Sequence, residues 1–233
     1  MKRQATSEAI GSAFLLATVV GSGIMGERLS GGNVAIALLA NTLATGAGLV
    51  ALILTFGPIS GAHFNPVVTL ADAWQGGTPW RMVPVYLAAQ VLGALFGVAI
   101  AHAMFGEPLF VASAHVRSGA AQLLSEFVAT FGLLSVIWGV SRRNAPFTPF
   151  AVGAYITAAY WFTASTSFAN PAVTLARSLT NTFSGIRPTD APGFIFAQVA
   201  GAIAATALFK FLAPATKAEA PRVESPAIAR EVA

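Results

Sequence analysis

The chain has 233 residues, of which 55% are hydrophobic and only 9% are charged. Soluble domains carry about 25% charged residues, so this composition excludes a soluble protein and indicates a single membrane-embedded bundle. The net charge is +4, but the basic residues lie mostly in loops and tails, where membrane topology explains them, and we expect no nucleic-acid partner. The sequence contains no cysteine, which excludes disulfides and thiolate metal sites.

Six apolar segments are long enough to cross a hydrocarbon layer of about 30 Å, which takes ~20 helical residues. They lie near residues 6–28, 34–57, 80–105, 119–141, 147–168 and 191–213. Two shorter apolar pieces lie near 66–75 and 171–180. Ten helical residues reach only ~15 Å, so these pieces are predicted to be half-helices that enter the membrane without crossing it.

Each short piece begins with an Asn-Pro pair, and the two surrounding segments nearly repeat each other. Residues 63–72 read HFNPVVTLAD and residues 168–177 read FANPAVTLAR. Pro66 and Pro171 suit the first helical position, because proline has no N–H to leave unsatisfied there. Asn65 and Asn170 can each cap a helix with the side-chain oxygen while the amide NH2 points elsewhere.

The two halves of the chain also match outside these segments. Glu8 opens the first span and Glu126 opens the fourth, while Gln90 and Gln198 occupy matching places in the third and sixth spans. Each half contains three spans, so the second half must enter the membrane from the opposite side. This pattern predicts an inverted repeat with a site at the bilayer midplane.

We expect one channel domain over residues 1–213, with repeats at about 6–105 and 119–213. Residues 214–233 are rich in Ala, Pro and charge, and they are predicted to form a disordered cytoplasmic tail. Of the 13 basic residues, nine fall on the side of the two termini, which predicts cytoplasmic termini. The four on the other side are Arg28, Arg117, Arg177 and Arg187.

Two half-helix N-termini that meet at the midplane would present two amide donors and roughly +0.5 charge each at one spot. A cation, including a hydrated proton, is disfavoured there, whereas water or a neutral hydroxylated solute can accept from both amides. A single Asn-Pro pair is more often an ordinary helix start. Two pairs at matching places in two repeats favour a pore.

These residues resemble the aquaporin and aquaglyceroporin (major intrinsic protein) family over about residues 6–213. The resemblance implies an all-α membrane protein with six transmembrane helices and two half-helices in an inverted repeat. It also implies a homotetramer with one pore per subunit, and passive conduction of water or small neutral solutes. The first motif departs slightly from the family's Asn-Pro-Ala, because Val67 follows Pro66.

A larger departure follows the second motif, where most family members carry Arg three residues after Asn. That position is Val173 here, and the other expected filter positions are Thr45, Ala158 and Ser167. This set has no charge, aromatic ring or histidine, which predicts a wide and weakly polar filter. It resembles the filters of bacterial aquaglyceroporin-like channels associated with arsenic resistance, which pass neutral arsenite and other uncharged metalloid acids.

Charged residues near the motifs are candidates for the pore mouths. Arg177 lies one turn beyond Val173, ~6 Å farther out, and it either lines the outer vestibule or anchors the outer loop. Asp72 holds the matching position in the first half and is expected near the cytoplasmic mouth. His63 is a candidate for the inner pore.

The buried polar residues are expected to be structural. By resemblance, Glu8 and Glu126 accept hydrogen bonds from loop N–H groups near the opposite half-helix. Gln90 and Gln198 are expected to hydrogen-bond between helices.

The sequence therefore predicts a passive channel of a bacterial inner membrane for water, glycerol-like polyols and neutral metalloid hydroxides such as arsenite. We expect no enzyme, no cofactor and no metal site. One alternative is a water and glycerol facilitator without a metalloid role. The others are an ion-coupled secondary transporter, which also uses inverted repeats and broken helices, and a structural membrane protein that conducts nothing.

Overall fold

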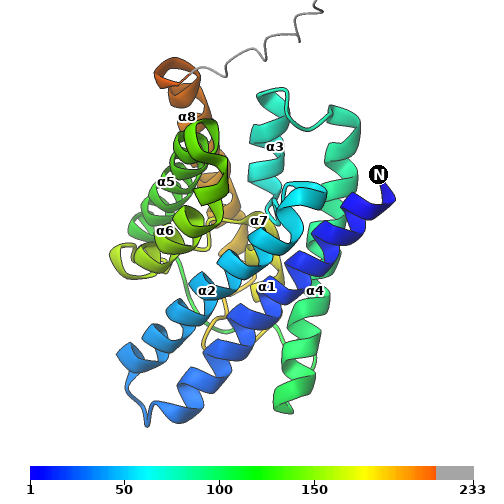
Figure 1. Cartoon of the computed structure of the whole chain (residues 1–233). Helices are drawn as coiled ribbons and strands as arrows, with labels where there is room; N and C mark the ends of the chain where they lie inside the picture. Colours follow the sequence, from blue (N-terminus) through cyan, green and yellow to red (C-terminus); the bar gives the residue numbers. More distant parts are fainter. Residues whose placement is uncertain (214–233) are drawn as a thin grey trace, which may run out of the picture.

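The computed structural model describes residues 1–213, and the predicted disordered tail at 214–233 lies outside the described residues. All regular elements within this range are helices (Figure 1). They are α1 (Lys2–Leu29), α2 (Val34–Ser60), α3 (Pro66–Trp74), η1 (Trp80–Met82), α4 (Val83–Phe105), α5 (Ala120–Asn144), η2 (Ala145–Phe147), α6 (Thr148–Phe162), α7 (Pro171–Arg177) and α8 (Ala191–Leu212). Each half reads long helix, long helix, half-helix, long helix, so the predicted fold class is confirmed.

Apolar composition accounts for the membrane-spanning part of the described chain. Five helical stretches are long and apolar enough to cross a membrane, and one of them, of 43 residues, runs continuously from Ala120 to Phe162. That stretch contains both α5 and α6, which are joined by the short turn η2. The six predicted spans therefore correspond to the six long helices of the structure.

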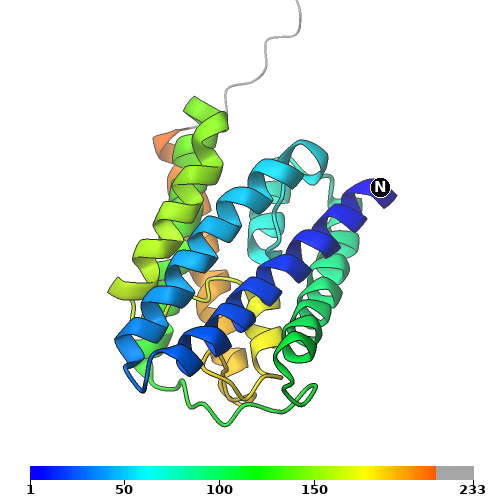
Figure 2. The same cartoon turned by 60° about the horizontal axis from the view of Figure 1, so that its bottom comes forward.

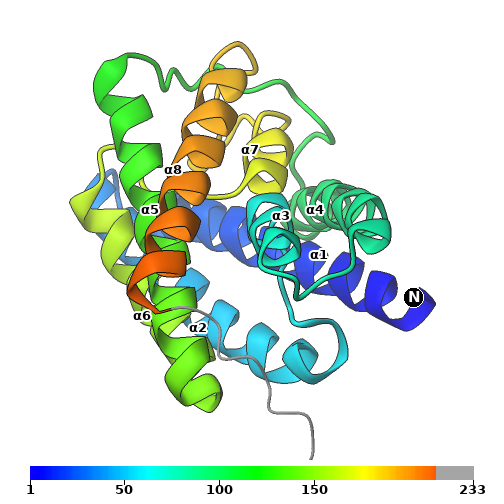
Figure 3. The same cartoon turned by 90° about the horizontal axis from the view of Figure 1, so that it is seen from above.

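The two repeats pack in the same manner, and each half-helix contacts helices of both repeats. Helix α1 packs against α2 and α4, and α5 packs against α6 and α8. Helices α3 and α7 lie between these groups (Figure 3). Besides the last helix of its own repeat, α3 contacts α8 and α7 contacts α4, so each half-helix bridges the two repeats.

The start of α1 and the end of α8 lie on one face, which we call the terminal face (Figure 2). The long loop at 106–119 lies on the other face, which we call the loop face. Helix α3 runs from the middle of the molecule toward the terminal face, and α7 runs from the middle toward the loop face. The two half-helices thus meet at their N-termini.

Glycines allow the long helices to approach closely at matching places in the two repeats. A Cβ atom at Gly93 of α4 would overlap the backbone carbonyl of Ala9 in α1. A Cβ atom at Gly201 of α8 would likewise press into the carbonyl of Phe127 in α5. Backbone contact of this kind is how small residues hold membrane helices together.

The structure corrects the predicted end of the fifth span, which was placed at 147–168. Helix α6 ends at Phe162, and Thr163–Ala169 form an irregular segment. Residues Thr166, Ser167 and Ala169 have positive φ angles of 61°, 51° and 47°. An apolar sequence indicates that a segment lies within the membrane. It does not indicate where the helix ends and the backbone begins to hydrogen-bond with other groups.

Candidate functional site

The two half-helices begin with the predicted asparagine caps. The Oδ1 atom of Asn65 accepts a hydrogen bond from the Val67 N–H at 3.1 Å. The Oδ1 atom of Asn170 accepts from the N–H groups of Ala172 and Val173 at 3.0 and 3.3 Å. These bonds satisfy donors that a helix start leaves open, and they fix the direction of each side-chain amide.

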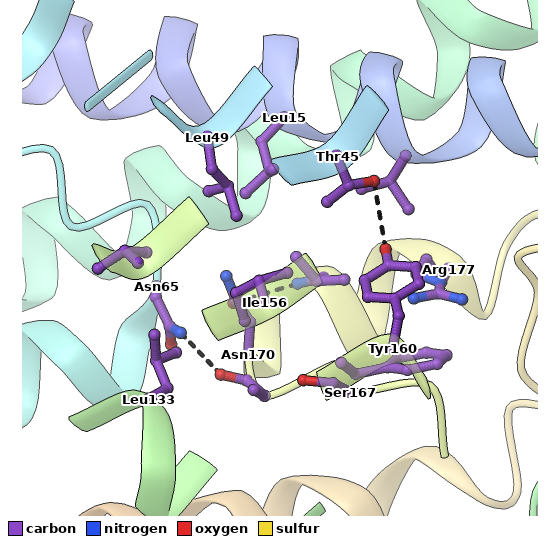
Figure 4. A pocket seen from close by; sticks show the side chains of 15 residues that line it. Leu15, Thr45, Leu49, Asn65, Leu133, Ile156, Tyr160, Ser167, Asn170 and Arg177 are labelled. Atoms are coloured by element: carbon purple, nitrogen blue, oxygen red, sulfur yellow. Dashed lines mark hydrogen bonds between the residues drawn. The ribbon is translucent and has the colours of Figure 1, made fainter. Parts of the chain in front are cut away.

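The same two asparagines join the repeats to each other. The Nδ2 atom of Asn65 donates to the carbonyl oxygen of Ala169, and Nδ2 of Asn170 donates to that of Phe64, both at 2.8 Å. Each acceptor immediately precedes the opposite asparagine. Because a primary amide carries two N–H donors, one N–H of each asparagine is left for a solute, and both residues line one cavity (Figure 4).

Glu8 holds the loop before α3 in place. Its carboxylate accepts hydrogen bonds from the N–H groups of His63 and Phe64 at 3.0 and 2.7 Å, and from Gln90 Nε2 at 2.8 Å. Gln90 also donates to Thr69 Oγ1 at 2.9 Å. The resulting chain of polar groups connects α1, α4 and α3.

Glu126 repeats this arrangement in the second half. It accepts from the N–H groups of Phe168 and Ala169, both at 2.9 Å, and from Gln198 Nε2 at 2.6 Å. Gln198 also donates to Thr174 Oγ1 at 2.9 Å. The expectation that each Glu serves the opposite half-helix is therefore wrong: each binds the loop of its own repeat, because its helix packs beside that loop.

The loops before the half-helices adopt matching left-handed backbone conformations. Ala62 and Phe64 have φ angles of 49° and 47°, and Ser167 and Ala169 have 51° and 47°. Each such non-glycine residue costs roughly 1–3 kcal/mol, so the buried carboxylates must hold the loops in this shape. Strain of this kind gives no signal in the sequence, since none of these residues favours positive φ.

A small cavity of about 60 Å³ extends from the two asparagines toward the loop face, and we call it the outer cavity. Figure 4 shows Asn65 and Asn170 at one end and Thr45, Tyr160 and Arg177 at the other. This volume holds a few water molecules. The lining residues are Leu15, Val19, Thr45, Leu49, Asn65, Leu133, Val152, Ile156, Tyr160, Ser167, Phe168, Ala169, Asn170, Val173 and Arg177.

Three of the four predicted filter residues, Thr45, Ser167 and Val173, line this cavity, but Ala158 does not. Ala158 is exposed on the outside of α6, and the cavity is lined instead by Ile156 and Tyr160. The physical reason is helical geometry: Ile156 and Tyr160 are four residues apart on one face, and Ala158 points away from that face. The ungapped count failed because the segment after α6 is irregular.

Beyond the predicted filter residues, the cavity lining contains a charged and an aromatic side chain. Arg177 lines the outer cavity and is buried, with 2% of its surface exposed. Its guanidinium carbon lies 3.4 Å from the centre of the Phe168 ring, and its Nε donates to the carbonyl of Ser184. Tyr160 also contributes a ring, and its hydroxyl donates to Thr45 Oγ1 at 3.3 Å.

A second cavity, of about 220 Å³, opens toward the terminal face and contains His63 and Asp72. It shares Leu133 and Val152 with the outer cavity, so the two cavities adjoin. The His63 Nε2 and Asp72 Oδ2 atoms are 3.8 Å apart. Arg177 and Asp72, which hold matching positions in the repeats, thus line opposite cavities. No group of three or more His, Asp and Glu side chains within residues 1–213 could hold a metal ion.

Arg117 ties the loop at 106–119 to the segments next to the outer cavity, a role that the sequence did not single out. Arg117 donates from Nε to the carbonyl of Gly185 at 2.8 Å and from Nη1 to that of Ser165 at 3.1 Å. Its backbone N–H donates to Asp190 at 2.9 Å. The hydrogen bond from Arg187 holds the pKa of Asp190 below its usual range, so Asp190 keeps its charge and secures the loop.

Known proteins resemble this chain in sequence and in fold. The family model described as Major intrinsic protein matches residues 1–167 and 147–231. Aquaglyceroporin AqpS of Rhizobium meliloti (strain 1021) is 55% identical over 212 residues, which is 91% of each chain. Aquaporin NIP1-3 of Oryza sativa subsp. japonica is 35% identical over 204 residues, covering 84% of this chain and 70% of that protein.

A solved structure shares the fold at lower sequence identity. The X-ray structure of the aquaglyceroporin from Plasmodium falciparum superposes with a TM-score of 0.71 and 19% identity. The match covers 91% of this chain and 96% of that one.

Proposed function

Because this chain belongs to the major intrinsic protein family, we propose that it is a passive channel for water and small neutral hydroxylated solutes. The solutes include glycerol-like polyols and neutral metalloid hydroxides such as arsenite. They move down their own gradients, and no ion is coupled to their passage.

The observation that carries this proposal is the paired arrangement of Asn65 and Asn170. Each amide has one N–H held by the opposite repeat and one left at the cavity, where two helix N-termini also concentrate positive potential. Such a site favours an uncharged hydrogen-bond acceptor and disfavours a cation or a hydrated proton. The adjoining cavities supply the path on either side.

Val173 supports the extension to metalloid hydroxides. This apolar side chain lines the outer cavity close to Asn170, so this part of the wall offers a solute no hydrogen-bond donor of its own. As(OH)3 is compact and neutral. It presents hydroxyl groups to the asparagine amides and a less hydrated surface to this apolar part of the wall. The alternative is a water and glycerol facilitator that rejects arsenite.

The buried carboxylates argue against an ion-coupled transporter. Glu8 and Glu126 each accept hydrogen bonds from two loop N–H groups and from a glutamine side chain. A carboxylate fixed in this way stabilises a loop and is not available to carry a proton in a transport cycle. We further propose a homotetramer in a bacterial inner membrane, with the terminal face cytoplasmic.

Flux measurements in proteoliposomes test the proposal. We expect water, glycerol and arsenite each to cross faster than in empty vesicles, at rates that rise linearly with the gradient and do not change with a proton uncoupler. Saturable flux that collapses with the uncoupler would contradict the channel mechanism. Water and glycerol passage with no arsenite passage would select the alternative.

A further inference from the structure

The outer cavity carries a second feature beyond the paired asparagines. We propose that Arg177 and Ser167 form a binding subsite for the oxyacid group of a small solute, such as a carboxylate, at the loop-face end of the pore. This inference rests on the channel function proposed above, and it adds a class of solute that the asparagines alone do not select.

The guanidinium of Arg177 is fixed in one orientation with its outer donors free. Its Nε bonds to the Ser184 carbonyl, and its plane lies against Phe168. The two terminal amino groups make no hydrogen bond to any other group in residues 1–213, although the residue is buried in the cavity wall. Because Arg177 lines the cavity, these amino groups keep N–H donors for a ligand there.

Ser167 independently points to a ligand at the same place. Its hydroxyl oxygen is buried and has no hydrogen-bond partner within the described residues. Ser167 lines the outer cavity together with Arg177, and its hydroxyl points toward the Asn170 end (Figure 4). The guanidinium and the hydroxyl therefore offer donors to one small cavity, where they can bind different oxygens of the same solute.

No carboxylate of the described chain forms an ion pair with Arg177. The ion pairs within residues 1–213 are Arg28–Glu107, His63–Asp72 and Arg187–Asp190, and none includes Arg177. The oxygens of Glu126 are occupied by loop N–H groups and Gln198. Arg117 adds a second positive charge. Its guanidinium carbon lies 5.0 Å from the centre of the Phe168 ring, which Arg177 also contacts. Two guanidinium groups thus share one nearby buried carboxylate, Glu126, so the local field favours an anionic or strongly polarised oxygen pair.

Glycolate and ethylene glycol are suitable probes, because they have the same number of carbons and differ in one carboxylate. We expect glycolate to bind the purified wild-type protein, detected by ligand-observed NMR, and to slow ethylene glycol flux when added on the loop face. In Arg177→Gln, both effects should need about tenfold more glycolate, the usual result of removing a charge-assisted bidentate contact.

Two further variants separate recognition from folding. Arg177→Lys keeps the charge but lacks the planar fork, so its glycolate affinity should fall between those of the wild type and Arg177→Gln. Glu27→Gln removes an exposed charge near the loop-face end of α1 and should leave glycolate binding unchanged. Wild-type protein that binds no glycolate, or an Arg177→Gln variant that binds it as tightly, would overturn the subsite.

The binding assay and the neutral flux assay fail independently. Absence of ethylene glycol flux in the wild type would contradict the channel proposal while glycolate binding still reports on Arg177. Normal ethylene glycol flux with no glycolate binding would contradict only the subsite.

Discussion

Val173 lies one helical turn before Arg177 on the same face of α7, and both side chains line the outer cavity. Val173→Arg should place a second guanidinium in this narrow space. We expect glycerol and arsenite flux to fall by about tenfold, the effect of ~1.4 kcal/mol on a barrier, while water flux survives. Solute-specific flux in proteoliposomes measures both.

Val173→Leu is the matched control, because it adds volume without charge. It should slow glycerol less than Val173→Arg does. Unchanged passage of glycerol and arsenite in Val173→Arg would show that this position does not control selection.

At the residue scale, the motifs predicted the asparagine caps but not the full lining of the pore. The repeated Asn-Pro pairs, followed by apolar residues, leave few other local structures for Asn65 and Asn170. Tyr160 was missed because the filter position on α6 was found by counting residues back from Asn170. Such a count takes no account of where α6 ends. The distance along α7 left open whether Arg177 lines the pore or anchors a loop; in the structure it does both.

The close contacts between long helices depend on Gly93 and Gly201. In the sequence, the only sign of this role is that each glycine follows a matching glutamine by three residues. Gly93→Ala should push α4 away from the Ala9 carbonyl of α1. We expect the free energy of unfolding to fall by about 1–3 kcal/mol, the usual cost of overpacking. This appears as a lower unfolding temperature of the purified protein in detergent. The buried polar chain from Glu8 to Thr69 depends on this same helix pair.

Gly139→Ala is the control for this prediction. A Cβ atom at Gly139 would lie 3.4 Å from the nearest atom, on the Phe209 side chain, and alanine favours a helix over glycine. Stability should therefore be unchanged or slightly higher. Equal effects of the two substitutions would show that close backbone approach at Gly93 is unimportant.

At the element scale, the sequence predicted all six long helices and both half-helices, with most ends shifted by a few residues. Hydrophobic length is a strong signal because the membrane demands it. The irregular segments at 61–64 and 163–169 could not be predicted, since their shape depends on carboxylates from distant helices. Glu8 is separated from His63 by 55 positions in the chain.

The whole molecule is predicted to sit with its terminal face in the cytoplasm. Because the native chain has no cysteine, single cysteines report topology without background. Ser118→Cys on the loop face should react with an impermeant maleimide in intact cells. Asn144→Cys on the terminal face should react only after the membrane is opened, and the reverse pattern would contradict the orientation.

At the scale of the whole molecule, the family resemblance seen in the two motifs is confirmed by the sequence match along most of the chain. The inverted repeat was predictable because an odd number of spans per half forces opposite entry. How the halves fit together was not: contact of α3 with α8 and of α7 with α4 arises from packing that no single segment encodes.

The reciprocal bonds of Asn65 to Ala169 and of Asn170 to Phe64 tie the two repeats together in the middle of the molecule. To dilate this aperture, both bonds would have to break together, and the strained loops behind them would have to give way. Widening of the passage at the two asparagines therefore needs more than the rotation of a single side chain.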